Sequence, residues 1–294
     1  MSSSPCQHSH HRIALAQNFL TSRRLVAMLL DRADIGPHDT VYDIGAGTGV
    51  ITEQLACRCR RVVAIEKDER LTGLLCRAYA GAPHVTVRHA DILRVSLPDT
   101  PYKVFANIPF NVTTDIVTKL LSAPNPPEDC YLVVQREAAA KFAGTPRESL
   151  YAALMKPWFA PSIVYHFRRA DFAPPPSVEV VMLRLRKRGP PLVVHADAWL
   201  YRDFVTYCFA AWRPSLRDTL KGLFSPRQLR YMQHTLALDL DATPTAVPFE
   251  QWLALFREFQ NVGTVEAKRV IAGAAERLRR RQATLHKTHR TRVR

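Results

Sequence analysis

The sequence predicts an α/β protein with a largely parallel sheet, followed by a small domain that contains only helices. Through the first two thirds of the chain, short apolar runs alternate with stretches of helix-type periodicity, which is typical of a parallel sheet covered by helices. After about residue 188 the strand-type runs stop, and apolar residues recur at helical spacing. A length of 294 residues and a hydrophobic content of 47% are sufficient for two packed cores.

Seven strands are expected, of which the last two form an antiparallel end of the sheet. They lie near residues 41–44, 61–65, 85–88, 102–106, 130–135, 163–167 and 179–186. A charged stretch with Gly and two Pro, residues 187–191, predicts a linker. Beyond it, helices are expected over 199–212 and 249–259, with a third that has Ser225 as its N-cap and Pro226 as its first residue.

The predicted organisation has five parts: a disordered leader (1–12), an α/β domain (13–187), a linker (188–195), a helical domain (196–263) and a basic tail (264–294). The leader has no apolar core, and no run of about 18 apolar residues occurs in the sequence. We therefore expect a soluble, cytoplasmic protein. The six cysteines are scattered and their one close pair, Cys57 and Cys59, lacks metal-site spacing, so we expect reduced thiols. His8, His10 and His11 could in principle hold a metal, but they lie in the Ser-rich leader before any apolar pattern, so we expect a disordered tail and no bound metal.

A glycine loop follows the first strand of the predicted sheet. Residues 45–49 read Gly-Ala-Gly-Thr-Gly, and an apolar-periodic helix pattern begins at Val50. Gly45 and Gly47 would allow a nucleotide-like ligand to approach the backbone at the carboxyl end of a parallel strand. Dinucleotide-binding loops use the longer G-x-G-x-x-G spacing to bring a helix N-terminus to pyrophosphate. S-adenosylmethionine has no phosphate, so the tighter spacing favours this methyl donor over NAD.

Two acidic residues follow the next two strands. Glu66 ends the second apolar run, where its carboxylate could accept both hydroxyls of a ribose. Asp91 follows the third run and could accept from a cofactor adenine amine, while Ile92 would offer an apolar surface to that ring. Each acid alone could be an ordinary strand-end residue, but their order at successive strand ends favours a ligand site.

Residues 107–110 read Asn-Ile-Pro-Phe just after the fourth strand, a pattern suited to methylation of an amine. The exocyclic amine of adenine is a poor nucleophile because its lone pair is conjugated into the ring. The side-chain carbonyl of Asn107 and a backbone carbonyl at the turn that Pro109 stiffens could each accept one amine hydrogen. Phe110 would then stack on the base. The alternative is an ordinary turn with a core phenylalanine.

The charge balance points to a polyanionic partner. The net charge is +15 and the isoelectric point is about 9.9, which favours nucleic acid, although a basic compositional bias or a membrane surface would also fit. Residues 264–294 hold ten Lys or Arg against two Glu, which predicts an arm that contacts phosphates. Five basic residues of the helical domain could also contact a nucleic-acid backbone or simply form a solvated face: Arg213, Arg217, Lys221, Arg227 and Arg230.

With these motifs in order, the chain resembles the S-adenosylmethionine-dependent rRNA adenine N6-methyltransferases, which include the Erm macrolide-resistance enzymes and the KsgA-type dimethyltransferases. The similarity extends from Gln17 to Arg186 and adds two motifs, residues 17–20 (Gln-Asn-Phe-Leu) and 171–174 (Asp-Phe-Ala-Pro). It implies a Rossmann-like methyltransferase domain in which Phe110 and Phe172 sandwich a flipped adenine. The run Pro174-Pro175-Pro176 lies between the last two predicted strands, so we expect Phe172 on a stiffened loop that faces the pocket. The cofactor contacts that the resemblance implies are Asn18, Leu20, Gly45, Glu66, Asp91 and Asn107.

Within this family the Asn-Ile-Pro-aromatic form and residues 135–138 (Gln-Arg-Glu-Ala) are more similar to Erm, since KsgA favours Leu at position 108. The Erm resemblance implies mono- or dimethylation of one adenine of 23S rRNA in the macrolide region. We expect a monomer acting before full ribosome assembly and giving macrolide-lincosamide-streptogramin B resistance. Two alternatives stay open. One is KsgA-like dimethylation of adjacent adenines in small-subunit rRNA, and the other is a non-catalytic RNA-binding assembly or transcription factor.

Overall fold

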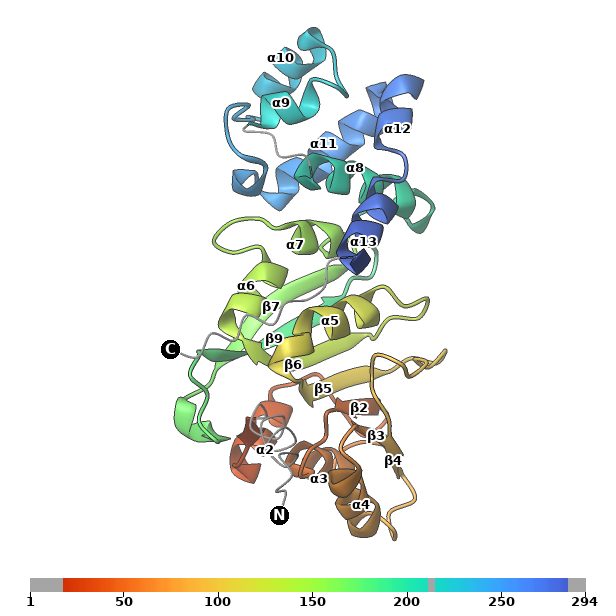
Figure 1. Ribbon diagram of the computed structural model, residues 1–294, viewed down its shortest axis with the longest axis vertical. Helices are drawn as coiled ribbons and strands as arrows, with labels where there is room; N and C mark the ends of the chain where they lie inside the picture. The colour runs from red at the N-terminus through yellow and green to blue at the C-terminus, as the bar shows by residue number, and fades with distance from the viewer. Residues whose placement is uncertain (1–17, 211–214, 285–294) are drawn as a thin grey trace, which may run out of the picture. The chain divides into compact units, whose positions relative to one another are not determined.

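The computed structural model describes residues 18–210 and 215–284 (Figure 1). The contacts group residues up to 140 together with 160–187 into a first unit, and 141–159 together with 188 onward into a second unit. The predicted leader and its histidines, Arg213 and residues 285–294 of the predicted tail lie outside the described residues. The domain boundaries taken from the sequence stay predictions, although the contact grouping differs from them by assigning 141–159 to the second unit.

The first unit is built on a seven-stranded sheet, which confirms the predicted α/β class. Its strands in spatial order are β4 (Val85–His89), β3 (Arg61–Glu66), β2 (Thr40–Ile44), β5 (Lys103–Asn107), β6 (Asp129–Gln135), β9 (Val180–Lys187) and β7 (Phe159–His166). The strands from β4 to β6 pair in parallel, whereas β9 is antiparallel to β6. All seven expected strands are present, most with limits within about two residues of the prediction; β7 begins four residues earlier.

Helices pack on this sheet through apolar residues at helical spacing. They are α2 (Arg23–Asp31), α3 (Val50–Ala56), α4 (Glu69–Ala78), α5 (Thr113–Leu121) and α6 (Arg136–Ala143). Ser22 caps α2 by accepting from Leu25 N, and Asp68 caps α4 by accepting from Leu71 N, which satisfies N–H groups that a helix start leaves unpaired. The core between layers consists of fully buried apolar residues, among them Val26, Leu55, Val62, Phe105 and Val133.

A second, two-stranded sheet joins the start of the described chain to a loop far along the sequence. β1 (Phe19–Leu20) pairs antiparallel with β8 (Phe172–Ala173), so that Leu20 lies opposite Phe172. The short 3-10 turn η2 (Arg169–Asp171) precedes β8, and η1 (Phe110–Val112) precedes α5. This small sheet brings two of the family-specific sequence motifs side by side.

The second unit is helical, as the sequence predicts for the region beyond the linker. Its elements are α7 (Leu150–Met155), η3 (His195–Asp197), α8 (Ala198–Ala210), α9 (Leu216–Leu220), α10 (Pro226–Thr235), η4 (Pro244–Ala246), α11 (Phe249–Val262), α12 (Val265–Ile271) and α13 (Ala274–Thr284). Ser225 caps α10 and Pro226 occupies its first turn, which confirms that prediction. An aromatic core forms around Phe204, whose ring centre lies 5.0 Å from that of Phe259 and 5.8 Å from that of Phe256.

The basic segment after Gly263 begins with two ordered helices. Ile271 is buried, and the carboxylate of Asp203 in α8 accepts from the backbone N–H groups of Gly273 at 2.7 Å and Ala275 at 2.9 Å. Asp203 therefore caps the start of α13, since it satisfies N–H groups that the helix itself cannot pair. Among the described residues, no helix is long and apolar enough to span a membrane.

Candidate active site

The predicted site residues meet at one edge of the sheet. The glycine loop 45–49 follows β2, Glu66 ends β3, Asp91 follows β4 and Asn107 ends β5. Because β2 to β5 run parallel, their carboxyl ends lie at the same edge, where ligands of open α/β sheets bind.

The glycine loop passes directly beside the Asn-Ile-Pro-Phe turn. Gly45 has φ +73°, and a Cβ built on it would lie 3.5 Å from the Asn107 carbonyl oxygen and 3.5 Å from Pro109 Cδ. Gly47 and Gly49 also have positive φ, of +58° and +87°. An L side chain is strained in this conformation. The structure therefore brings together the two motifs that the sequence assigned to the methyl donor and to the target amine.

Phe19 lies against the glycine loop, a role that the sequence reasoning missed. A Cβ added to Gly47 would be 2.8 Å from Phe19 Cε1, closer than real Cβ atoms approach. The neighbouring Leu20, an expected cofactor contact, is instead buried in the core of the first unit. The two side chains diverge because successive residues of a strand point to opposite faces. Because β1 has only two residues, the sequence carried no periodic signal for this placement of Phe19.

Glu66 is only 3% exposed, and its carboxylate organises the loop. Oε2 accepts from Gly47 N at 2.8 Å, and Oε1 accepts from Lys67 N and Asp68 N, each at 2.8 Å. A carboxylate offers about four lone-pair sites, so one acceptor site remains on Oε2 beside the glycine loop. The predicted bond to ribose is compatible with this count, but Glu66 is also part of the framework of the loop.

Asp43 is a further buried acid next to the loop. Its Oδ2 accepts from Thr52 Oγ1 at 2.6 Å, while Oδ1 is buried without a partner among the described residues. Burial raises the pKa of Asp43 to about 7, and the nearby charge of Glu66 adds to this rise. The sequence reasoning assigned Asp43 no role of its own, although an acid inside an otherwise mostly apolar strand was a usable signal.

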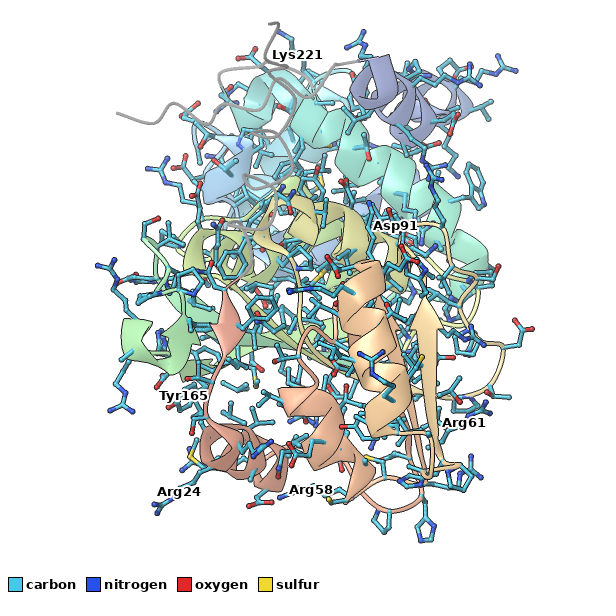
Figure 2. The ribbon with its side chains drawn as sticks, turned by 60° about the horizontal axis from the view of Figure 1, so that its bottom comes forward. Arg24, Arg58, Arg61, Asp91, Tyr165 and Lys221 are labelled. Carbon is cyan, nitrogen blue, oxygen red and sulfur yellow. The ribbon has the colours of Figure 1, made fainter. Side chains whose placement is uncertain are left out.

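Asp91 (labelled in Figure 2) and Ile92 occupy different surroundings. Asp91 accepts from Lys67 Nζ at 3.0 Å and from Leu93 N at 3.0 Å, and the Lys67 hydrogen bond is the main reason why its pKa is lowered. Ile92 is buried. Asp91 therefore remains an ionised acceptor at the strand edge, as its predicted role requires.

The side chain of Asn107 is oriented by the backbone carbonyl of Asn18, the residue just before β1. Its Nδ2 donates to the carbonyl oxygen of Asn18 at 2.7 Å, and Asn18 in turn donates through its own Nδ2 to Pro174 O at 2.7 Å. With the amide nitrogen of Asn107 engaged, its Oδ1 remains to accept a hydrogen from another group. The carbonyl of Pro109 accepts from Val112 N at 3.2 Å, at the start of the 3-10 turn.

The two aromatic residues predicted to hold the target base differ in exposure. Phe110 is half-buried at the start of η1. Phe172 is 3% exposed and packs edge-on against Phe167 at 5.4 Å, rather than lying on a stiffened loop that faces the pocket. The difference arises because Phe172 begins β8, and pairing with Leu20 of β1 covers it. The sandwich of a flipped adenine stays a prediction.

The residues present fit a nucleoside cofactor such as S-adenosylmethionine. Gly45, Gly47 and Gly49 all have positive φ, which gives the loop a conformation that L side chains rarely adopt, and the unpartnered buried Oδ1 of Asp43 lies two residues before Gly45. Among residues 18–210 and 215–284, no group of three or more His, Cys, Asp or Glu side chains could hold a metal ion.

This fold, with its glycine loop beside an Asn-Ile-Pro-Phe turn, is that of a methyltransferase directed at an amine. More particularly, the family model described as ribosomal RNA adenine dimethylase matches residues 8–261, and the chain belongs to this family. It is an rRNA adenine N6-methyltransferase.

Relatives of two kinds are similar to the chain. An rRNA adenine N-6-methyltransferase of Bacillus licheniformis is 30% identical over 242 residues, which cover 82% of this chain and 84% of the relative. A ribosomal RNA small subunit methyltransferase A of Geobacter metallireducens is 30% identical over 272 residues, covering 86% and 96%. The chain in the crystal structure of the 23S rRNA methyltransferase ErmE is 31% identical with a TM-score of 0.77, and the match covers 83% of this chain and 100% of the chain in that structure.

Proposed function

We propose that this enzyme methylates N6 of one flipped adenine in 23S rRNA, with S-adenosylmethionine as the donor. The observation that carries the proposal is the orientation of the Asn107 side chain, whose nitrogen is engaged by Asn18 O beside the glycine loop. The remaining Oδ1 is an acceptor suited to a hydrogen of an exocyclic amine. Modification of the macrolide region would protect the ribosome from macrolides, lincosamides and streptogramin B.

The chemistry would depend on acceptors and positioning rather than on a general base. S-adenosylmethionine supplies an electrophilic methyl group on a sulfonium, which is a good leaving group. Asn107 Oδ1 and a backbone carbonyl at the Pro109 turn would accept the two amine hydrogens, returning electron density to nitrogen and stabilising positive charge that develops there. Phe110 would stack on the base. Fixing the target amine in position against the methyl donor can supply a large part of the rate enhancement.

The cofactor would lie across the strand ends. Glu66 would accept hydrogen bonds from the cofactor ribose and Asp91 from its adenine, and Ile92 would pack against the adenine ring. Because Gly45 and Gly47 have no side chain, the cofactor could contact the backbone of the loop directly. Asn18, Leu20 and Asn107 are the remaining contacts that the family resemblance implies. The side chain of Leu20 is buried in the core, so it would have to contact the cofactor from there.

Three features support 23S rather than small-subunit rRNA. Ile108 and the Gln-Arg-Glu-Ala sequence at 135–138 are the Erm-like forms of their motifs. The third is the similarity to the ErmE structure, at a TM-score of 0.77. One observation favours the small-subunit alternative: the match to the small subunit methyltransferase A of Geobacter metallireducens covers 96% of that relative. We further propose that the protein acts as a monomer on rRNA before assembly is complete.

The test is methyl transfer to protein-free 23S and 16S rRNA with labelled S-adenosylmethionine, mapped by primer extension. Asn107→Ala is the test variant, and Asn261→Ala, an exposed Asn of the second unit, is the matched control. A stop at one 23S adenine that requires Asn107 supports the proposal. Label in 16S only identifies the small-subunit activity, and label in neither RNA identifies a binding factor.

A further inference from the structure

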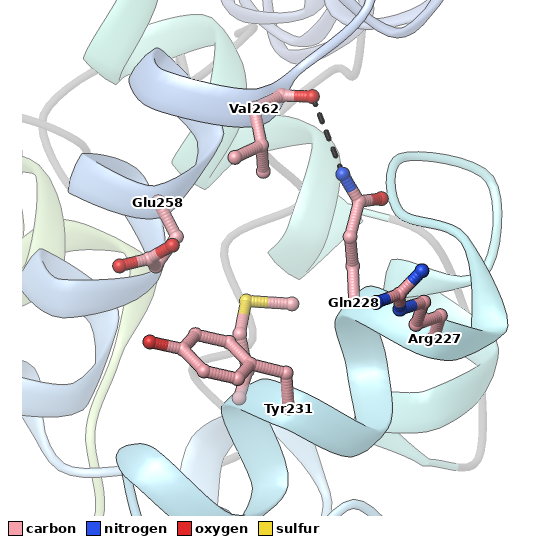
Figure 3. Close-up of a pocket in the computed structure, with 6 residues that line it drawn as sticks. Arg227, Gln228, Tyr231, Glu258 and Val262 are labelled. Carbon is pink, nitrogen blue, oxygen red and sulfur yellow. Dashed lines mark hydrogen bonds between the residues drawn. The ribbon is translucent and has the colours of Figure 1, made fainter.

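A cavity of about 200 Å³ lies between α10 and α11 of the second unit (Figure 3). It is lined by Arg227, Gln228, Tyr231, Met232, Glu258 and Val262. Drug-sized ligands occupy pockets of roughly 300–1,000 Å³, so this cavity suits a single ring system rather than a whole large ligand.

The walls of the cavity are apolar and open to solvent. Tyr231 is 61% exposed and Val262 is 39% exposed, whereas Met232 is buried. Figure 3 shows the Tyr231 ring and Val262 on opposite sides of the space. An exposed tyrosine ring offers a face on which a planar group can stack, and the valine would close the other side of such a stack.

Charged groups of opposite sign lie at the two ends of the cavity. In Figure 3 Glu258 is at the end opposite Arg227. Neither side chain has a hydrogen-bond or ion-pair partner within the part of the chain that the structure describes. Gln228, by contrast, is engaged at both ends: Oε1 accepts from Ser225 N at 2.8 Å, and Nε2 donates to Val262 O at 3.4 Å. The groups available to an occupant are therefore one carboxylate and one guanidinium.

We propose that this cavity binds one unpaired guanine of the RNA substrate. The inference rests on the proposed function only in requiring an RNA substrate. Unpaired bases in RNA are commonly recognised by aromatic stacking together with hydrogen bonds to their Watson–Crick edge. Here Tyr231 supplies the stacking face and Glu258 the hydrogen-bonding group. Arg227 and the exposed Arg230, one turn further along α10, supply positive charge for the adjoining phosphates.

The carboxylate selects guanine among the four bases. Guanine presents two adjacent donors on its Watson–Crick edge, N1–H and an N2–H, which match the two oxygens of Glu258. Adenine and cytosine each present one amine beside an unprotonated ring nitrogen, which would face the second carboxylate oxygen with its lone pair. Uracil has one N–H between two carbonyl oxygens. An acceptor-only group therefore pairs fully with guanine alone.

A carboxylate at this position would otherwise weaken RNA binding. On a chain of net charge +15 that binds a polyanion, an acidic side chain in this cavity repels phosphate unless a donor group of the RNA meets it. Glu258 thus excludes the wrong base as well as pairing with the right one.

The test measures equilibrium binding of the full chain to four fluorescent single-stranded heptanucleotides, UUUNUUU with N as G, A, C or U. The variants are Tyr231→Ala, Tyr231→Phe and Glu258→Gln, with Glu266→Gln on α12 as a charge-matched control. We expect the wild type to favour the G oligonucleotide by about tenfold. Tyr231→Ala should lose about tenfold for that oligonucleotide, Tyr231→Phe should keep it because the ring remains, and Glu258→Gln should lose the preference for G.

Unchanged affinities in Tyr231→Ala and Glu258→Gln would overturn the inference, and would be the result if the cavity takes a protein side chain instead. A wild type without preference for G would also overturn it. Methyl transfer to 23S rRNA tests the proposed function separately. If the protein does not methylate 23S rRNA but does prefer the G oligonucleotide, the proposed function is wrong and the guanine site stands. If it methylates 23S rRNA but shows no preference for G, only the guanine site is wrong.

Discussion

Asn107 at the end of β5 donates its side-chain amide to the backbone carbonyl of Asn18, 2.7 Å away and 89 residues earlier in the chain. The acceptor is a main-chain atom, so any residue at position 18 could supply it. The donor, however, is the side chain of Asn107, and an amide carries a donor and an acceptor together. The contact decides which end of the Asn107 side chain faces outward as an acceptor, and it makes the orientation of that side chain depend on β1.

Asn107→Asp tests this orientation. The variant keeps side-chain acceptors but loses the N–H, so a carboxylate oxygen would face the Asn18 carbonyl and be repelled from it. We expect turnover to fall by about 10²–10³-fold, as when one positioned transition-state partner is removed, and to match Asn107→Ala. Single-turnover methyl transfer at saturating cofactor is the measurement. Turnover within a few fold of wild type would contradict the proposed role of the amide.

Gly47→Ala should damage the cofactor loop for two separable reasons. The new Cβ meets Phe19 Cε1 at 2.8 Å, and φ of +58° strains an L residue by about 1–2 kcal/mol. The double variant Phe19→Ala with Gly47→Ala removes the clash but not the backbone strain, so its loss should be smaller than the sum of the two single losses. Thermal unfolding and cofactor titration measure both effects. Gly81→Ala, where a Cβ meets nothing within 4 Å, is the control, and additive losses would contradict the contact.

Most of the sheet and of its ligand edge can be predicted from local sequence signals. Apolar runs locate the strands, and parallel pairing then requires the loop 45–49, Glu66 and Asn107 to lie at one edge. The contacts that orient these groups are not local. The Asn18 carbonyl reaches Asn107 only through β1, a strand of two residues, which is too short to give a periodic signal.

The burial of Phe172 was unpredictable for the same reason. A Pro-rich stretch indicates a loop, but pairing of β8 with β1 makes Phe172 part of the core. In the basic C-terminal segment, the charge pattern indicated an arm. The cap that Asp203 places on Gly273 and Ala275, 70 and 72 residues away, orders the start of α13.

Phe110 and Phe172 should respond differently to truncation. Phe110 is half-buried, so Phe110→Ala should reduce turnover by about tenfold or more through lost stacking, with cofactor affinity retained. Phe172→Ala should in addition destabilise the fold by about 3–5 kcal/mol, because its side chain is in the core. Phe172→Leu keeps most of the volume and separates the effects. If it retains both stability and full turnover, Phe172 does not stack on the target base.

The C-terminal basic segment should contribute phosphate contacts through residues 285–294, which carry Lys287, Arg290, Arg292 and Arg294. Replacing these ten residues with a Gly-Ser segment should lower the slope of log affinity against log salt by up to about 3, with little change in thermal stability. Deletion of everything after Gly263 should also lower stability, since it removes buried Ile271 and the α13 start that Asp203 caps. An unchanged salt slope in the Gly-Ser variant would show that these residues do not contact phosphate.

Asp43 should make stability depend on pH with an unusual sign. Burial raises its pKa from 3.8 to about 7, so the folded state binds a proton more tightly than the unfolded state between these values. The free energy of unfolding should therefore fall as pH rises from about 4 to 7, at up to about 1.4 kcal/mol per pH unit, and level off above 7. The free energy of unfolding of Asp43→Asn should not fall in this way, so the variant should gain stability relative to the wild type as pH rises from about 4 to 7. Thr52→Val, which removes the hydrogen bond that favours the ionised form, should extend the fall to higher pH.

Urea unfolding of the three proteins from pH 4 to 9, without cofactor, measures these free energies. A pH-independent difference between wild type and Asp43→Asn would contradict the buried, proton-binding state of the Asp43 carboxyl.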